Sequence, residues 1–181
     1  TGGVAEALGI PASRVFSSST GVIGEPLPYE RITAKIPALV AQLQEAGIDM
    51  AAQAIMTTDT FPKGAAATIE GEGGVINIAG IAKGSGMIAP DMATMLVYIF
   101  TDAKIAPANL QKMLSRNVDA TFNSITVDSD TSTSDTLLLC ATGKSAAAEV
   151  KGPVAKAFEA ALHGVMMNLA HQVGRDGEGA T

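Results

Sequence analysis

The stretch KGSGMIAPDMATML at 83–96 holds the residues best suited to chemistry. Lys83 stands beside Gly84 and Gly86, so an ammonium and backbone amides could together meet an anion or a developing negative charge. The alternative is a plain Gly-rich connection between two strands, which composition alone favours. A nucleotide phosphate loop is a poor match, because the lysine precedes the glycines.

Thr94 is a second candidate, at the point where this loop meets the most apolar run of the chain. An unactivated threonine hydroxyl is a weak nucleophile. If the bond between Ala93 and Thr94 were cut, Thr94 would gain a free α-amine with a pKa of about 8. That amine could act as the base for its own hydroxyl. The alternative, which physics alone favours, is an ordinary β-branched residue that starts a strand.

Two further polar loops carry hydroxyl groups. In SSSTGVIG at 17–24, the Thr20 hydroxyl and the Gly21 amide could form an oxyanion hole, or they could form only a Ser/Thr turn. TTDT at 57–60 presents Thr57, two more threonines and Asp59. The alternative there is a helix N-cap cluster, with Lys63 as a surface charge.

The sequence does not support a calcium loop, a disulfide or a histidine-based catalytic set, and no metal site is expected. VDSDTSTSD at 127–135 fails as a calcium loop, because neither the required glycine nor the closing glutamate is present. Cys140 is the single cysteine, which rules out an internal disulfide, and its apolar surroundings predict an inert core thiol. His163 and His171 form no recognisable catalytic set with serine or cysteine.

Composition bounds the class of protein. The chain has 181 residues, enough for one domain, and 12 basic against 18 acidic residues give a net charge of −6. With no basic cluster, a nucleic-acid partner is not expected. The hydrophobic share of 47% excludes intrinsic disorder. No run approaches the ~20 apolar residues of a membrane helix, and no export signal opens the chain, so we expect a cytoplasmic protein with no membrane partner.

The elements that must position these residues mix helices and strands. Apolar spacing predicts helices over 3–10, 29–46, 107–121 and 149–175, the last as one helix or two. Strands are expected at 14–16, 66–69, 74–78, 95–100, 124–127 and 136–142, and 51–56 is either a buried strand or a helix end. This pattern predicts an α/β or α+β domain with loops gathered at a site.

Five blocks in order, STGVIG (19–24), TTDT (57–60), KGSGMIAPDMATML (83–96), DTSTSDT (130–136) and RDGEGAT (175–181), resemble the ornithine acetyltransferases, also called glutamate N-acetyltransferases. The third block is the most specific. The resemblance implies an α/β fold, a layered α-β-β-α-type sandwich similar to the N-terminal nucleophile hydrolases. It also implies that the chain is part of a longer family member, which fits its opening without Met.

The resemblance further implies a precursor that cleaves itself between Ala93 and Thr94. The single acetyltransferase segment 1–181 would then divide into 1–93, the end of a first (alpha) subunit, and 94–181, the start of a second (beta) subunit. Thr94 would be the nucleophile that takes acetyl from N-acetylornithine and passes it to glutamate in arginine biosynthesis. Asp91 departs from the family, which more often has Asn at that position.

Further site residues carry over from the same blocks. Thr20 and Gly21 match the oxyanion-stabilising pair, and Thr57, Lys83, Thr94 and Glu178 match substrate-contacting positions. No cofactor is implied, although acetyl-CoA serves as an acetyl donor in bifunctional members. The implied partner is the complementary subunit, in a heterotetramer of two alpha and two beta chains.

Two rival functions stay open. A self-cleaving aminopeptidase or amidase of related fold would use the same nucleophile but deliver the acyl group to water. A non-catalytic binding fragment would hold small acidic or amino-acid ligands through the 83–86 and 19–21 loops. Its chain would stay uncut, and it would catalyse no reaction.

Overall fold

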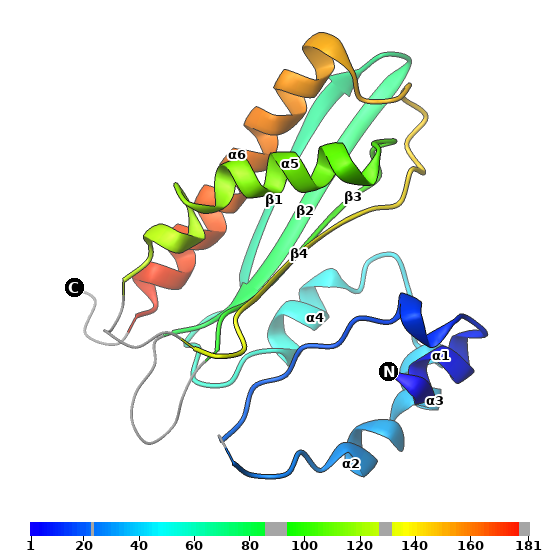
Figure 1. Ribbon diagram of the computed structural model, residues 1–181, viewed down its shortest axis with the longest axis vertical. Helices are drawn as coiled ribbons and strands as arrows, with labels where there is room; N and C mark the ends of the chain where they lie inside the picture. The colour runs from blue at the N-terminus through cyan, green and yellow to red at the C-terminus, as the bar shows by residue number, and fades with distance from the viewer. Residues whose placement is uncertain (23, 86–93, 127–131, 178–181) are drawn as a thin grey trace.

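The computed structural model describes residues 1–22, 24–85, 94–126 and 132–177, and its centre is a four-stranded sheet (Figure 1). The strands β1 (Lys63–Gly71), β2 (Gly74–Lys83), β3 (Leu96–Thr101) and β4 (Thr136–Ala141) lie in that order. β1 pairs with β2 and β2 with β3 in antiparallel fashion, whereas β3 and β4 are parallel. The strands expected near 66–69, 74–78, 95–100 and 136–142 are thus confirmed, the first two longer than expected.

A tight turn sets the register of the first two strands. Gly71 pairs with Gly74, so Glu72 and Gly73 form the turn, and Gly73 takes a φ of 80°. A two-residue hairpin turn needs a positive φ, which glycine reaches without a steric penalty.

Two helices cover one face of this sheet and build the core with it. They are α5 (Pro107–Val118) and α6 (Gly152–Arg175), which confirms both expected helices and makes the second one continuous. Buried side chains of β2 and β3, among them Ile76, Ile78 and Ile99, pack with them in one cluster. The α6 side chains that are buried are Phe158, Leu162, Val165, Met166, Leu169, Ala170 and Val173.

A side-chain amide fastens the end of α6 to the edge of the sheet. Gln172 accepts the Gly64 amide at 3.1 Å and donates to the Gly64 carbonyl at 2.8 Å. Its amide also donates to Asn168 one turn earlier, at 2.7 Å. The helix therefore cannot slide along β1 without breaking this set of hydrogen bonds.

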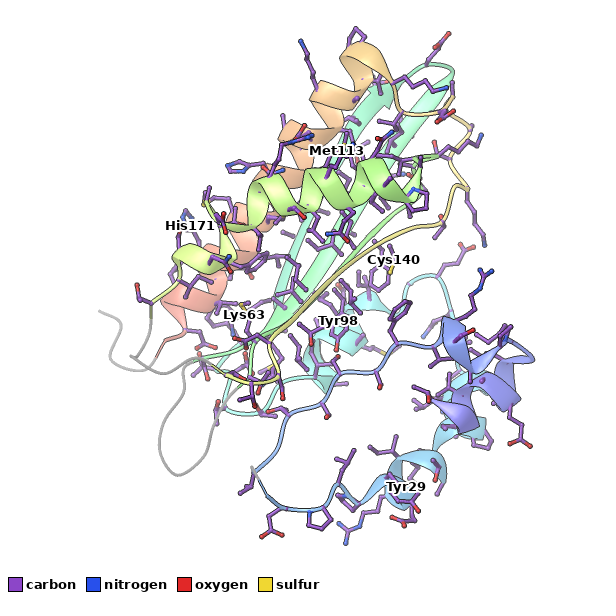
Figure 2. The ribbon with its side chains drawn as sticks, viewed as in Figure 1. Tyr29, Lys63, Tyr98, Met113, Cys140 and His171 are labelled. Atoms are coloured by element: carbon purple, nitrogen blue, oxygen red, sulfur yellow. The ribbon has the colours of Figure 1, made fainter. Side chains whose placement is uncertain are left out.

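The opposite face of the sheet is covered only towards one end. Helix α4 (Ile48–Ala54) packs there against β2, which settles the 51–56 segment mainly as helix, and Ser18 hydrogen-bonds the Tyr98 hydroxyl of β3. Farther along this face Phe100 is exposed, as is Cys140, which Figure 2 labels on β4. The expectation of a core thiol at Cys140 is wrong, because the alternation of the strand turns it away from the helices.

The N-terminal segment departs most from expectation. It forms α1 (Gly2–Leu8), as expected, then a 3₁₀ turn at Ala12–Arg14 where a strand was expected at 14–16. The single helix expected at 29–46 is instead α2 (Tyr29–Thr33) and α3 (Ile36–Ala41). Pro37 explains the break, because proline has no amide hydrogen and its ring would clash with the preceding helical turn.

The layering predicted from the resemblance is visible only in part. The described residues contain one sheet with α5 and α6 on one face, and no second sheet. The strand expected at 124–127 is also wrong where it is described, because Phe122–Ser124 is a 3₁₀ turn followed by irregular chain. A mixed α/β fold is therefore confirmed, and the four-layer sandwich stays a prediction.

Gly80→Ala is expected to lower the free energy of unfolding by about 1–3 kcal/mol, because it overpacks the sheet–helix contact. An added Cβ would lie 2.9 Å from Leu169 and 3.0 Å from Ile99. Gly164→Ala is the matched control, since its Cβ would meet nothing within 4 Å and alanine favours a helix by up to about 1 kcal/mol. Urea unfolding of both variants would contradict this packing if Gly80→Ala were the more stable.

Candidate active site

The C-terminal end of β2 meets the 57–60 loop that follows α4. Lys83 is the last residue of β2, and its side chain is completely buried. Its ammonium donates to the Thr57 hydroxyl at 3.3 Å. Two residues matched to substrate contacts by resemblance are thus brought together, although they lie on separate segments.

Asp59 organises the loop around this pair. One carboxylate oxygen accepts the Gly84 amide at 2.7 Å, and the other accepts the Thr57 amide at 3.1 Å. Gly84 follows Lys83 directly and has a φ of 147°, which suits glycine and lets the chain leave the strand. Asp59 therefore ties the backbone beside Thr57 to the backbone beside Lys83. The N-cap expectation for this cluster is wrong, because β1 rather than a helix follows it.

Lys63 lies behind Asp59 and joins it to the end of α6. Its ammonium lies 2.7 Å from Asp59 Oδ1 and 2.5 Å from Asp176 Oδ2, and the three side chains are at most 2% exposed. Asp176 also accepts the Thr60 amide at 3.0 Å and the Thr60 hydroxyl. The expectation of a surface charge at Lys63, labelled in Figure 2, is wrong, because two carboxylates accompany it into the interior.

Both carboxylates of this cluster are held in the charged form. Burial is the largest influence on Asp59 and would raise its pKa, but the amides of Gly84 and Thr57 and the Lys63 ammonium outweigh it and lower the pKa. Burial also acts against Asp176, where hydrogen bonds from Lys63 and Thr60 again lower the pKa. Asp59, Lys63 and Asp176 thus form a charged cluster with one cation and two anions.

Lys83 has a different electrostatic setting. Burial lowers the pKa of its ammonium, the charge of Lys63 lowers it further, and Asp59 and Asp135 only partly restore it. Among the described residues no carboxylate lies within ion-pairing distance of Lys83. A buried ammonium in this state can hold an incoming anion or give up its proton.

Thr94 lies two residues before β3 and is 5% exposed. Its hydroxyl lies 3.0 Å from the Ser132 hydroxyl, and the next residue, Met95, donates its amide to Asp135 at 2.9 Å. β3 pairs with β2 up to Leu96 opposite Lys83, and a Cβ on Gly84 would lie 3.4 Å from the Met95 Cα. Thr94 is therefore placed at the same end of the sheet as Lys83.

The other predicted site residues are less closely placed. Thr20 is half-buried and Gly21 exposed, in an irregular segment whose nearest described anchor is the Ser18–Tyr98 hydrogen bond. Among described residues, no hydrogen bond joins Thr20 to Thr57, Lys83 or Thr94. Ala93 and Glu178 lie outside the described residues, so the cleavage site and one predicted substrate contact stay predictions.

Sequence reasoning missed the roles of Lys63, Asp176 and Ser132. The spacing of Asp59 and Lys63, four residues apart, was a weak signal for one ion pair. Asp176 is 113 residues away from Lys63 along the chain, and nothing local indicates that they pair.

Three observations concern other kinds of site. An open groove lies between the second half of α6 and the 120–126 segment, with His163, His171 and Arg175 in its lining, and it contains none of the predicted site residues. In the described ranges, no three His, Cys, Asp or Glu gather in a way that could hold a metal ion. None of the helices described is long and apolar enough to cross a membrane.

The α/β sheet thus carries a buried lysine, Lys83, and a buried threonine, Thr94, at one end. The model of the ArgJ family matches residues 1–181, and the chain belongs to this family. The arginine biosynthesis bifunctional protein ArgJ of Ruegeria pomeroyi is 62% identical over 181 residues, 100% of this chain and 44% of that protein. The protein of the same name from Thermosynechococcus vestitus is 49% identical over 98% of this chain and 43% of its own length.

A solved structure is also similar. The crystal structure of arginine biosynthesis bifunctional protein argJ from Bacillus halodurans is 43% identical, with a TM-score of 0.43, and covers 44% of this chain and 38% of that one. The chain thus spans less than half the length of the curated relatives named here.

Acidification is expected to lower the melting temperature steeply below about pH 4, because Asp59 and Asp176 then bind protons more readily in the unfolded chain. Their lowered pKa values add stability above the unfolded pKa, and that stability is lost as pH falls through the folded pKa. Asp176→Asn removes one such group and should flatten the pH dependence, whereas the exposed control Glu6→Gln should not. Thermal melts from pH 2 to pH 7 give the comparison, and equal slopes in both variants would contradict it.

Proposed function

We propose that this chain carries the acetyl-transfer site of an ArgJ enzyme, with Thr94 as nucleophile after cleavage of the Ala93–Thr94 bond. The observation that supports this most is the buried Lys83 ammonium, hydrogen-bonded to Thr57 at the end of the sheet where Thr94 lies. Membership of the ArgJ family supports it independently.

In the proposed reaction, the Thr94 hydroxyl oxygen attacks the acetyl carbonyl of N-acetylornithine, and its proton passes through the Thr94 α-amine to the leaving amine. The amide C–N bond breaks, ornithine departs and an acetyl-threonine ester remains. The α-amine of glutamate then attacks the ester, forms N-acetylglutamate and returns a proton to the Thr94 oxygen. Both steps pass through an oxyanion, which Thr20 and Gly21 would stabilise.

Lys83 is assigned to a substrate carboxylate. A charge-assisted hydrogen bond in a water-poor site is stronger than one at the surface, and Lys83 has no carboxylate of its own among the described residues. Glu178 would meet the substrate α-amine by the same charge complementarity. Acetyl-CoA is an additional acetyl donor in this proposal.

The proposed partner is the complementary ArgJ subunit, in an assembly of two alpha and two beta chains. Large apolar side chains are exposed in the N-terminal segment and on the sheet face that carries Phe100, with Phe16 74% and Leu43 72% exposed. Such surfaces fit contact with other protein rather than with water.

A product assay separates this proposal from its rivals. The transferase forms N-acetylglutamate faster than free acetate, whereas an amidase releases acetate regardless of glutamate. A binding fragment produces neither.

Thr94→Ala is expected to abolish both chain cleavage and acetyl transfer, because no hydroxyl remains to attack. Thr94→Ser, which keeps the hydroxyl, is the control and should retain both. Intact mass under denaturing conditions and the product assay, on the protein expressed from its complete coding sequence, give the readout. Acetyl transfer by Thr94→Ala would remove Thr94 as the nucleophile.

Lys83→Met is expected to raise the KM for glutamate about 10- to 100-fold, because a hydrogen bond to a charged group is worth about 1.5–3 kcal/mol. The exposed Lys112→Met controls for loss of a positive charge in general. Steady-state kinetics with varied glutamate test this, and an unchanged KM in Lys83→Met would mean that the carboxylate binds elsewhere.

A further inference from the structure

The charged cluster of Asp59, Lys63 and Asp176 joins three parts of the chain that are distant in sequence. Asp59 belongs to the loop after α4, Lys63 begins β1, and Asp176 caps the C-terminal end of α6. One ammonium lies within 2.7 Å of both carboxylates, and all three side chains are buried. None of the three was matched to a substrate contact.

Each carboxylate of the cluster accepts hydrogen bonds from a chain segment that contains a residue matched to a substrate contact. Asp59 accepts the amides of Thr57 and Gly84, so it fixes the backbone of Thr57 and the backbone next to Lys83. Asp176 fixes the loop at Thr60 and lies two positions before Glu178. In the part of the chain that the structure describes, the Lys63 ammonium donates to Asp59 and Asp176 and makes no hydrogen bond to Thr57 or Lys83.

We propose that Asp59, Lys63 and Asp176 are positioning residues that hold the Thr57 hydroxyl and the Lys83 ammonium in one fixed geometry for substrate. The inference rests on the proposed function for its kinetic consequences but not for its geometry. Asp59 and Lys83 both contact Thr57, Asp59 through the amide and Lys83 through the hydroxyl. Asp176 lies on the other side of Lys63.

The titration of Lys83 reports whether the charges of the cluster act on this side chain. The charges that shift the pKa of Lys83 are those of Asp59, Lys63 and Asp135. Loss of the Asp59 charge should therefore lower the pKa of Lys83, and loss of the Lys63 charge should raise it.

The experiment compares Asp59→Asn, Asp176→Asn and Lys63→Met in the protein expressed from its complete coding sequence. Both carboxylate variants should lower kcat/KM for glutamate, by about 100-fold if a contact moves by about 1 Å. The loss should fall mainly on KM. A purely structural role would lower the folded fraction and apparent kcat, with KM unchanged.

The second readout is the titration of Lys83 by NMR of lysine labelled with ¹³C at Cε, the signal being assigned by its loss in Lys83→Arg. It needs no turnover, so it tests the inference even if the wild type proves to transfer no acetyl, a result that would defeat only the proposed function. The expected pattern is a lower Lys83 pKa in Asp59→Asn and a higher one in Lys63→Met.

An unchanged KM in both carboxylate variants, or the same Lys83 titration in Asp59→Asn as in wild type, would overturn the inference. If Asp59→Asn does not fold, as circular dichroism would show, Lys63→Met decides in its place. A Lys83 pKa that stays put or falls in Lys63→Met overturns the inference, and a rise supports it.

Discussion

The candidate site depends on one set of interactions, the buried ion pairs of the Lys63 ammonium with Asp59 and Asp176. Removing a charge from water costs several kcal/mol even after relaxation, so one cation does not stabilise two buried anions unless other donors assist. The amides of Thr57, Thr60 and Gly84 supply that assistance. The electrostatic requirement of the cluster therefore dictates where three separate backbone segments lie.

The division of the sheet into two faces complements this cluster. On one face, α5 and α6 bury the aliphatic side chains of β2 and β3 in a continuous core, which makes the sheet a rigid base. The opposite face is covered near the end of β2 and the start of β3, where Lys83 and Thr94 lie. It is exposed farther along, at Phe100. Rigid strands that end in polar loops hold reactive groups with little freedom to move.

Sequence alone predicts the regular part of this architecture. The hairpin of β1 and β2, the apolar β3 and the amphipathic α5 follow from periodicity and turn chemistry, which are local properties. Cys140 shows the limit, because an apolar run does not say which side of an edge strand receives a helix. Lys63 shows it more strongly, since its burial depends on Asp176, a partner that only the folded chain brings near. Thr57, Lys83 and Thr94 could be named from motifs, but the cluster behind them could not.

The hydrogen bonds from Gln172 to Gly64 have a consequence for how the sheet can grow. Among the described residues β1 is an edge strand, and an edge offers its free amides and carbonyls to any further strand. At Gly64 both groups are already taken by one glutamine side chain. A strand that approached β1 would have to displace this glutamine before it could pair at that end. A single residue of α6 therefore protects one end of this sheet edge from pairing with another strand.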